Sequence, residues 1–418
     1  MMGKIEATSG TGADNAGKAA PRSPSFGDAA LLAAISSLGP FAANTYVPAF
    51  GTIAADLGTT MVGVQQTLSV YLAAYAVSAL FVGAISDAVG RKPVIIAATL
   101  VFAAASIGAM FADSLEALYC WRVLQGMCAS VGAVLSQAVI RDRWDGADAA
   151  RLIGLTAILF ALAPAAAPVA GGWITLLAGW RAVFAFLALF NVCVALLVWR
   201  CLKESLERQR RQPFRAGPLL SGYFRAVRHK AFMAGALGHG FAFLGTIVYS
   251  AGAADFVLHI MARDVNDFGL LMVPLVAATM VGAFIGPRIM AKIGNWRLIF
   301  GGILVMVASG ILGIWLELEG VGGYPAVIVF PMIYNVAVSA VRPVMNVMNL
   351  DWFPTRRGLA ASIQQFCLTM AFCLSSSVFV PLVMGEAWKY SAVMLGAALM
   401  TACLWLVVRS AAKRAERR

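Results

Sequence analysis

An arginine inside an apolar stretch is the first residue whose chemistry needs a reason. Arg122, Gln125 and Gly126 form the pattern RxxQG within the apolar run 115–140. A guanidinium in an apolar phase is costly and normally faces polar partners or a water-filled cavity. Arg122 is therefore a candidate for proton coupling or substrate contact. The alternative role is a structural hydrogen-bonding hub.

Few titratable groups accompany Arg122, since nearly all of the 20 acidic residues fall in loops or near run ends. Asp255 follows the run 231–254, and an extension of that run through 256–262 would place it in an outer cavity. Otherwise it is a solvated residue at a helix end. His239 lies roughly 13 Å along the helix from Lys230, and histidine titrates near neutral pH. Both are candidates for proton coupling, although His239 can also be a packed hydrogen-bonding residue.

Aromatic and amide side chains recur in the apolar runs. Such groups can line a cavity for amphipathic molecules. The alternative for each is helix packing or anchoring at the membrane surface. The expected cavity residues are Asn44, Tyr46, Tyr71, Tyr75, Gln125, Tyr249, Asn335, Gln364 and Gln365.

A short loop between two apolar runs carries glycines and charges at defined spacing. Gly83, Asp87, Gly90, Arg91 and Lys92 form GxxxDxxGRK. The glycines permit a tight turn and close helix approach. Asp87 can pair with Arg91 or with a helix N-terminus, and Arg91 with another carboxylate. We refer to these five residues as the loop latch; the alternative is a turn whose charges only fix its side of the membrane.

The runs that must position these residues have the length of membrane spans. The chain is 61% hydrophobic and 12% charged, whereas soluble chains carry about 25% charged residues. A span needs about 20 residues to cross a hydrocarbon core of roughly 30 Å. The composition therefore predicts an all-α membrane protein. Twelve runs lie at 29–50, 62–85, 94–112, 115–140, 151–172, 181–200, 231–254, 268–289, 297–316, 324–344, 358–384 and 388–409.

A long basic stretch divides the twelve runs into two six-helix bundles. The linker 201–230 separates residues 29–200 from residues 231–409. A weak internal echo supports a duplication, because Gly90 and Gly294 follow the second and eighth runs. We expect residues 1–28 to form a disordered cytoplasmic tail, since they are rich in Gly, Ala, Ser and Pro. Residues 410–418 form a basic cytoplasmic tail.

The distribution of Lys and Arg predicts the orientation. Basic residues near span ends are retained in the cytoplasm. Nearly all of the 32 Lys and Arg residues fall in the tails and in alternate loops, and only Arg181, Arg263 and Lys389 fall in the opposite loops. Both termini are therefore expected in the cytoplasm. The net charge of +12 follows from this topology and requires no nucleic-acid partner.

Three of these patterns together resemble the major facilitator superfamily. The loop latch resembles its cytoplasmic loop signature, and the RxxQG pattern resembles its second signature. Ala163, Ala167, Pro168, Gly171 and Gly172 are similar to the antiporter signature GxxxGPxxGG, with two glycines replaced by alanine. Small residues allow tight packing and proline weakens the local helix, so this segment can act as a pivot; ordinary transmembrane packing is the alternative.

The first run indicates a branch of that superfamily. The segment NTYVPA (44–49) is similar to the DxYxPA segment of the Bcr/CflA branch, and YSAGAADFVL (249–258) is similar to its seventh-span region. The resemblance implies a major facilitator fold and a drug exporter coupled to protons. The branch has an aspartate where this chain has Asn44. An amide cannot take up and release a proton near neutral pH, so residue 44 cannot serve here as the proton-coupling residue.

The leading hypothesis is export of small amphipathic compounds by proton antiport, with Arg122 and a cavity carboxylate or histidine as the switch. One alternative is a uniporter or exchanger of anionic or zwitterionic metabolites, since Arg122 is cationic and Asn44 neutral. Another is a membrane receptor that does not transport. The sequence carries no HExxH, P-loop or CxxC pattern, so neither an enzyme nor a metal or other cofactor is expected. We expect a monomer in the bacterial inner membrane, spanning it many times.

Overall fold

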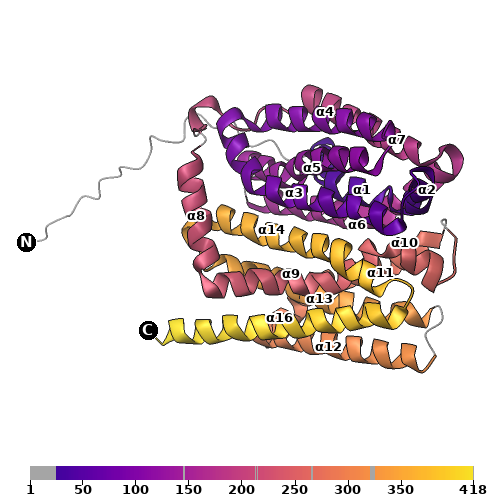
Figure 1. The fold of residues 1–418 in the computed structure, drawn as a ribbon. Coiled ribbons are helices and arrows are strands. Elements are labelled where there is room, and N and C mark those ends of the chain that lie inside the picture. The colour runs from indigo at the N-terminus through magenta and orange to yellow at the C-terminus, as the bar shows by residue number, and fades with distance from the viewer. Residues whose placement is uncertain are drawn as a thin grey trace, which may run out of the picture.

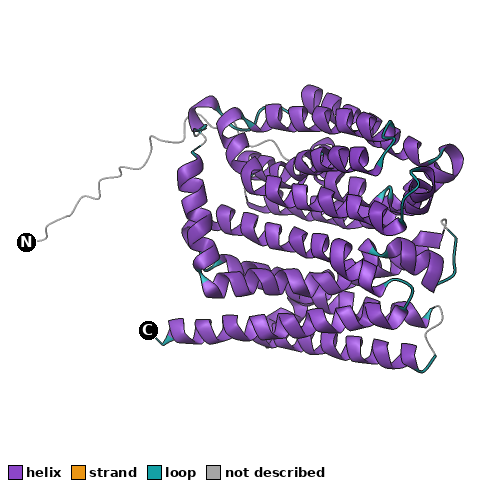
Figure 2. Ribbon diagram, viewed as in Figure 1, coloured by secondary structure: helices purple, strands orange, loops and turns teal. Residues whose placement is uncertain are grey.

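The computed structural model describes residues 25–144, 146–211, 213, 215–264, 267–320 and 325–417. These residues form helices and loops and include no strand (Figure 2). The long helices run side by side in two stacked halves, and α1 begins at the end of the molecule where α16 finishes (Figure 1). We call this the proximal end and the opposite one the distal end. The expectation of an all-α fold is confirmed.

The first half is built from the chain before the linker. Its first span is interrupted after Asn44, where Thr45 and Tyr46 form a turn and a short 3₁₀ segment that contains Pro48 follows. The helical segments are α1 (Phe26–Asn44), η1 (Val47–Ala49), α2 (Phe50–Asp56), α3 (Met61–Val89), α4 (Arg91–Met110), α5 (Leu115–Arg143), α6 (Gly146–Ala178) and α7 (Trp180–Cys201).

The second half has two spans that contain a short π-helical turn, one at the end of the span and one before its last helical turn. Its helical segments are α9 (Lys230–Ala251), α10 (Ala253–Asp255), η3 (Phe256–Ile260), α11 (Phe268–Ile293), α12 (Asn295–Leu318), α13 (Ala326–Leu350), α14 (Arg357–Leu374), η6 (Ser375–Phe379), α15 (Val380–Val383) and α16 (Ala387–Glu416). The short helices η2 (Arg208–Arg210), α8 (Ala216–Arg228) and η5 (Pro354–Arg356) lie in connecting segments.

Every expected run falls on one of these helices or on a series of them. Among the described residues, eleven helices are long and apolar enough to cross a membrane, and part of α6, Ala166–Ala178, forms a shorter apolar helix. The seventh run does continue beyond Ala251, through α10 and η3. The predicted spans are therefore confirmed in place and order.

Two boundaries differ from the sequence prediction. The sequence predicts a disordered tail through residue 28, but α1 begins at Phe26. Ser25 and Asp28 form a reciprocal capping box there, which satisfies backbone amides at the start of the helix. Residues 1–24 of that tail lie outside the described residues. The linker 201–230 is not only a loop, since it contains α8.

The internal echo has a structural counterpart. Gly90 separates α3 from α4 with φ of 116°, and Gly294 separates α11 from α12 with φ of 81°. Both angles lie in the region that favours glycine. The two halves therefore use the same kind of tight proximal turn after their second span.

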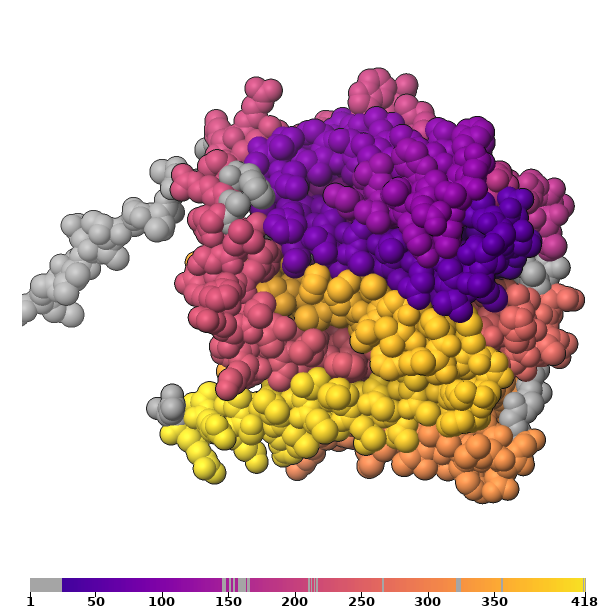
Figure 3. All heavy atoms as spheres, in the orientation of Figure 1, coloured from indigo at the N-terminus to yellow at the C-terminus, as the bar shows by residue number. Residues whose placement is uncertain are grey.

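The two halves contact each other along a few helices. Helix α3 packs along α14 and η6, and α6 packs along α11. In Figure 3 the indigo and purple helices of the first half lie directly on the orange and yellow helices of the second half. The interface between these helices is where a cavity shared by both halves can form.

Candidate functional site

A cavity of about 170 Å³ lies between the two halves. Its wall comes from two helices of the first half, α1 and α3, and three of the second half, α9, α13 and α14. The lining residues are Gly39, Pro40, Ala43, Asn44, Tyr71, Leu72, Tyr75, Phe243, Thr246, Ile247, Ser250, Arg342, Gln365, Leu368, Thr369 and Phe372. Because both halves contribute, a movement of one half against the other would change this cavity's shape.

The wall is mostly apolar and aromatic, with a few polar groups and one cation. The guanidinium carbon of Arg342 lies 4.6 Å from the centroid of the Phe243 ring. None of the described residues that line the cavity is acidic, and Arg342 forms no ion pair within the described part of the chain. The cavity therefore presents an uncompensated positive charge beside aromatic surface.

Four of the expected cavity residues lie on this wall. Asn44 donates from Nδ2 to the carbonyl oxygen of Pro40 at 2.7 Å, which holds its amide against its own helix. Tyr71 donates its hydroxyl to the Gly39 carbonyl oxygen at 2.9 Å. Tyr75 and Gln365 complete this set. Aromatic rings and amides from both halves thus meet at one surface.

The other five expected residues are not on the wall, because each is packed inside its own half. Tyr46 and Gln125 surround Arg122. Tyr249 packs edge-on against Phe256, with ring centroids 5.1 Å apart. The remaining two form hydrogen bonds with residues of α9. Asn335 Oδ1 accepts from the Thr246 hydroxyl at 2.7 Å, and Gln364 Nε2 lies 3.2 Å from His239 Nδ1.

Arg122 sits in a closed aromatic box next to the cavity. Its guanidinium carbon lies 4.1 Å from the Tyr46 ring centroid and 4.2 Å from that of Tyr71, and the residue is fully buried. Its Nη1 donates to Gln125 Oε1 at 2.8 Å, and Gln125 Nε2 donates to Ser106 Oγ at 2.8 Å. Nε and Nη2 have no hydrogen-bond partner among the described residues. The charge is held mainly by the two ring faces.

The aromatic box around Arg122 gives a structural reason for the RxxQG pattern. Tyr71 is shared between the box and the cavity, since its ring stacks on Arg122 and also lines the cavity wall. Gln125 lies one helical turn from Arg122, which is the spacing that lets the two side chains meet. Arg122 itself does not reach the cavity, so it can act on a ligand only through Tyr71 or by a rearrangement.

Asp255 is buried at the distal end, away from the cavity wall. Its Oδ2 accepts hydrogen bonds from Gly385 N and from the Tyr390 hydroxyl, both at 3.0 Å. Its Oδ1 lies 3.1 Å from His259 Nδ1. The expected extension of the seventh span is present, and the carboxylate is fixed by three partners rather than facing the cavity or bulk solvent.

His239 lies on the cavity side of α9, just beyond the wall. Residues 239, 243, 246 and 250 follow helical spacing, so His239 shares a face with the lining residues Phe243, Thr246 and Ser250. It is buried and contacts Gln364. Of the two titratable candidates, His239 is therefore the nearer to the cavity in helical position.

Arg342 is a residue for which the sequence suggested no role. It lies in the run 324–344, so the signal that singled out Arg122, an arginine within an apolar run, was present there too. Phe243 and Phe372 carried no such signal, since phenylalanine is common in every span. Within the described residues no group of His, Cys, Asp and Glu could hold a metal ion.

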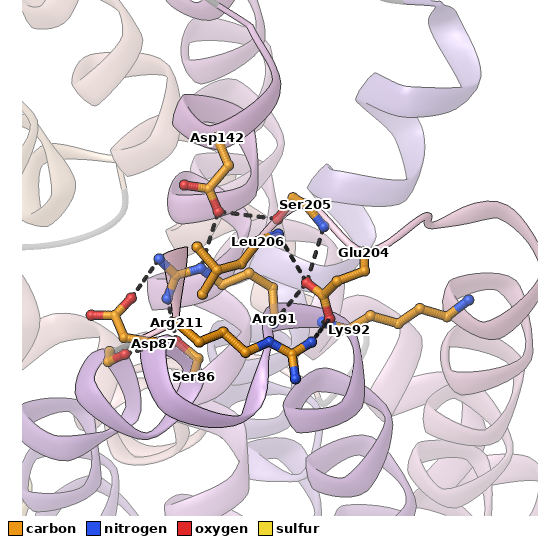
Figure 4. A network of polar contacts seen from close by, with 10 residues as sticks. Ser86, Asp87, Arg91, Lys92, Asp142, Glu204, Ser205, Leu206 and Arg211 are labelled. Carbon is orange, nitrogen blue, oxygen red and sulfur yellow. Dashed lines mark hydrogen bonds and ion pairs between the residues drawn. The ribbon is translucent and has the colours of Figure 1, made fainter. Parts of the chain in front are cut away.

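The loop latch is an ion-pair network at the proximal end of the first half (Figure 4). Arg91 Nη2 pairs with Asp87 Oδ1 at 2.6 Å, and Arg91 Nε with Asp142 Oδ2 at 3.1 Å. Arg91 Nη1 also donates to Ser86 Oγ. The guanidinium thus ties the end of α3 to the end of α5.

Glu204 binds the N-terminus of α4, a position for which Asp87 was the sequence candidate. Its carboxylate accepts from the backbone amides of Arg91 at 3.0 Å and Lys92 at 3.3 Å. It also accepts from the amides of Ser205 and Leu206 and pairs with Arg211 Nη2 at 3.8 Å. A carboxylate at a helix N-terminus is favourable because the first amides have no partner within the helix. Through Glu204, the linker therefore joins the loop latch and holds the start of α4.

The antiporter-like segment of α6 packs closely on the end of α1. A Cβ atom at Gly171 would overlap the carbonyl oxygen of Thr45. Ala163, Ala167, Pro168 and Gly172 are also buried. By contrast, a Cβ atom at Gly83 of the latch would meet no atom within 4 Å. The structure thus gives a packing reason for glycine at Gly171, and none at Gly83 in this conformation.

The halves are joined on the distal side of the cavity by hydrogen bonds between α3 and the second half. Gln65 Nε2 donates to the Ala251 carbonyl oxygen at 2.9 Å and to Ser376 Oγ at 3.0 Å. Gln66 Nε2 donates to the Ser377 carbonyl oxygen at 3.0 Å, and Ser69 Oγ to Ser376 Oγ at 3.1 Å. These contacts close the distal side of the interface.

The sequence and the fold are similar to those of known membrane transporters. The family model described as Major Facilitator Superfamily matches residues 30–330. The "Uncharacterized MFS-type transporter YdgK" of Bacillus subtilis is 30% identical over 357 residues, which is 84% of this chain and 87% of that protein. The "Bicyclomycin resistance protein homolog" of Haemophilus influenzae is 26% identical over 71% of this chain and 75% of its own length.

A third relative and two solved structures are also similar to this chain. The "Chloramphenicol resistance protein" of Pseudomonas aeruginosa is 29% identical over 68% of this chain and 66% of its own. A crystal structure of a D-xylose-proton symporter superposes with a TM-score of 0.70 at 15% identity, covering 90% of this chain and 97% of that one. An inward-facing bacterial homologue of the lysosomal transporter Spinster gives 0.69 at 14% identity, covering 91% and 96%. At these identities the structures support the fold alone.

Proposed function

The chain belongs to the major facilitator superfamily, and from this premise we propose that it exports small amphipathic compounds across the bacterial inner membrane in exchange for protons. It is a multi-pass membrane transporter rather than an enzyme. The observation that carries the proposal is the cavity shared by the two halves. A ligand site at such an interface, reached from either side by rocking of the halves, is the usual route to alternating access.

The chemistry of the cavity wall supports the proposed substrate class. Aromatic and aliphatic surface with a few convergent polar groups suits a compound that has an apolar body and one or two polar substituents. Relatives named for resistance to bicyclomycin and to chloramphenicol agree with that class. They also confirm the resemblance to the Bcr/CflA branch.

The distal hydrogen bonds define what must change during the cycle. Opening the cavity to the distal side requires Gln65, Gln66 and Ser69 to leave their partners on α9 and η6. We place the proximal end in the cytoplasm, because most basic residues lie there. In this orientation the described conformation is closed toward the outside, with residues 29–200 and 231–409 as the two moving units of one monomer.

Proton coupling needs a titratable group other than residue 44. We favour His239, because it shares a helix face with three lining residues and contacts Gln364 beside the cavity. Asp255 is the second candidate, and its three partners would have to release it first. Arg122 would act with either group through Tyr71, which both stacks on Arg122 and faces the ligand.

A second candidate function rests on Arg342. One cation and no acidic residue among the described lining groups favours an anionic or zwitterionic metabolite moved by uniport or exchange. The same feature also narrows the substrate class of the leading proposal, because a cationic wall disfavours organic cations and favours neutral or anionic compounds.

Transport by purified protein in proteoliposomes tests both candidates. We would load chloramphenicol, an aromatic carboxylate such as salicylate, or the cation tetraphenylphosphonium, and measure flux with and without an imposed pH gradient. The leading proposal predicts gradient-driven flux of the neutral compound, weak flux of the cation, and loss of the gradient effect in His239→Gln. Flux of the carboxylate that ignores the gradient would favour the second candidate. Ligand-induced stabilisation without any flux would favour a receptor.

A further inference from the structure

Helix α8 has a placement that the transport proposal does not explain. It spans 13 residues, Ala216–Arg228, in the linker between the halves. Figure 1 shows it running across the proximal ends of the spans, roughly perpendicular to them. Because the spans cross the bilayer, a helix in this position lies parallel to the membrane plane and near the depth of the lipid headgroups.

One face of α8 is packed on protein and joins the two halves. Ala226 is fully buried in a cluster with Phe232, Ala360 and Ile363 of the second half. Tyr223 donates its hydroxyl to the carbonyl oxygen of Leu80, on α3 of the first half, at 2.6 Å. Helix α8 therefore contacts both α3 and α14, in addition to lying in the segment that joins the two halves covalently.

A second face of α8 is apolar and uncovered. Leu220, Phe224 and Val227 expose 54%, 58% and 54% of their surfaces. Their spacing of four and three residues puts them in one row along the helix. In Figure 3 the rose-coloured helix lies open at the edge of the molecule. Such a row is unfavourable in water, and at the end of a membrane-spanning bundle the adjacent apolar phase is the acyl region of the bilayer.

A basic row borders this apolar row. Arg225 and Arg228 are exposed, and Arg215 precedes the helix. None of the three forms an ion pair within the described part of the chain. The guanidinium carbon of Arg228 lies 4.2 Å from the ring centroid of Phe224, so charge and apolar surface are in direct contact. Helices with an apolar face beside arginines are typical of the boundary between headgroups and acyl chains.

We propose that α8 is a lipid-binding helix, in which Leu220, Phe224 and Val227 insert into the proximal leaflet and Arg225 and Arg228 bind anionic phospholipid headgroups. A second protein copy is a poorer occupant, because a specific interface buries about 800 Å² on each partner, more than one row of three side chains supplies. Bound lipid would hold α8 in place and so stabilise the Tyr223 link between the halves. The inference does not depend on the transported compound.

Hydrogen exchange in lipid nanodiscs tests this placement. The full-length protein would be placed in phosphatidylcholine discs and in discs that also contain phosphatidylglycerol, and backbone exchange of the 216–228 segment compared. We expect exchange to slow by about fivefold for each arginine that meets anionic lipid. Arg225→Gln with Arg228→Gln should abolish this lipid dependence, because glutamine keeps helix propensity but not charge. Arg414→Gln, an exposed charge at the same end, should leave it intact.

A second variant isolates the apolar row. Phe224→Ala replaces the ring with the best helix former, so faster exchange of α8 in both kinds of disc would report loss of membrane insertion rather than weaker helix propensity. Exchange that is equal in the two lipids for the unaltered protein would overturn the proposal. So would a lipid dependence that survives the double glutamine variant. Protection that rises with protein density and ignores lipid charge would assign the row to a second copy instead.

Discussion

Arg342 and Phe243 form a cation–aromatic pair on the cavity wall, with the guanidinium carbon 4.6 Å from the ring centroid. The pair joins α13 to α9 within the second half, so it positions the only cation among the described lining residues. A ligand carboxylate that reached it would gain a charge-assisted hydrogen bond in a poorly solvated place. Charge selection by the cavity should therefore depend on this residue.

Replacing Arg342 by glutamine should weaken transport of an aromatic carboxylate. A hydrogen bond to a charged group contributes about 1.5–3 kcal/mol, so the KM should rise roughly tenfold to a hundredfold. Chloramphenicol, which is neutral, should change much less. Arg342→Lys keeps the charge and should recover part of the carboxylate affinity. Equal losses for both substrates in Arg342→Gln would indicate a structural role for Arg342 rather than selection by charge.

In the aromatic box around Arg122, the contribution of the Tyr46 ring to stability should be separable from that of the Tyr46 hydroxyl. Tyr46→Leu removes one of the two ring faces, and a desolvated cation–π contact contributes about 2 kcal/mol. We expect a clear drop in Tm, measured by tryptophan fluorescence in detergent, and a loss of transport. Tyr46→Phe keeps the ring and loses only the hydroxyl contact with Thr67 at 3.0 Å. Its Tm should fall less; a drop as large as that of Tyr46→Leu would contradict the box.

The latch should depend on Glu204 although the sequence signature does not include it. Glu204→Gln removes the charge that faces the amides of Arg91 and Lys92, and should lower stability by about 1–3 kcal/mol. Amide exchange at the start of α4 should become faster. The neighbouring Glu207 is exposed and forms no ion pair within the described residues, so Glu207→Gln is a matched control. Equal exchange in both variants would mean that Glu204 of the linker does not stabilise the start of α4.

Much of the fold can be predicted from the sequence because lipid imposes a simple requirement on each membrane span. Each span must be long, apolar and helical, so the apolar runs along the sequence predict the number and order of the helices, and their ends less closely. The helix α8 was missed because it is short and amphipathic within a basic segment. Its packed side depends on Ala360 and Ile363, which lie far away along the chain.

The cavity was only partly predictable, because residue type does not reveal which way a side chain points in a span. Tyr71 and Tyr46 are both tyrosines beside Arg122, but only Tyr71 reaches the wall. Tyr249 carried the same signal and packs against Phe256 instead. Which face of a helix meets the opposite half is decided by packing between the halves, and no local pattern records it.

Close packing of α6 on α1 should make Gly171 intolerant of a side chain. Gly171→Ala places a methyl group on the Thr45 carbonyl oxygen, and overpacking of this kind costs typically 1–3 kcal/mol. We expect a lower Tm and reduced flux, because α1 carries Asn44 on the cavity wall. Gly83→Ala is the control, since its methyl group meets no atom within 4 Å. If Gly171→Ala were as stable and active as Gly83→Ala, α6 would not be packed as described.

Asn44 offers a direct test of where the proton is carried. Its amide lies on the cavity wall, where the Bcr/CflA pattern has an aspartate, and an amide cannot exchange a proton near neutral pH. Asn44→Asp restores a carboxyl group that faces the ligand. We expect the variant's chloramphenicol flux in proteoliposomes to respond more steeply to an imposed pH gradient than that of the unaltered protein. Asn44→Ala, which stays neutral, should show no such gain.

If His239 already carries the proton, Asn44→Asp with His239→Gln should still respond to the gradient while His239→Gln alone does not. No response in the double variant would show that a carboxyl group at position 44 cannot take over the coupling.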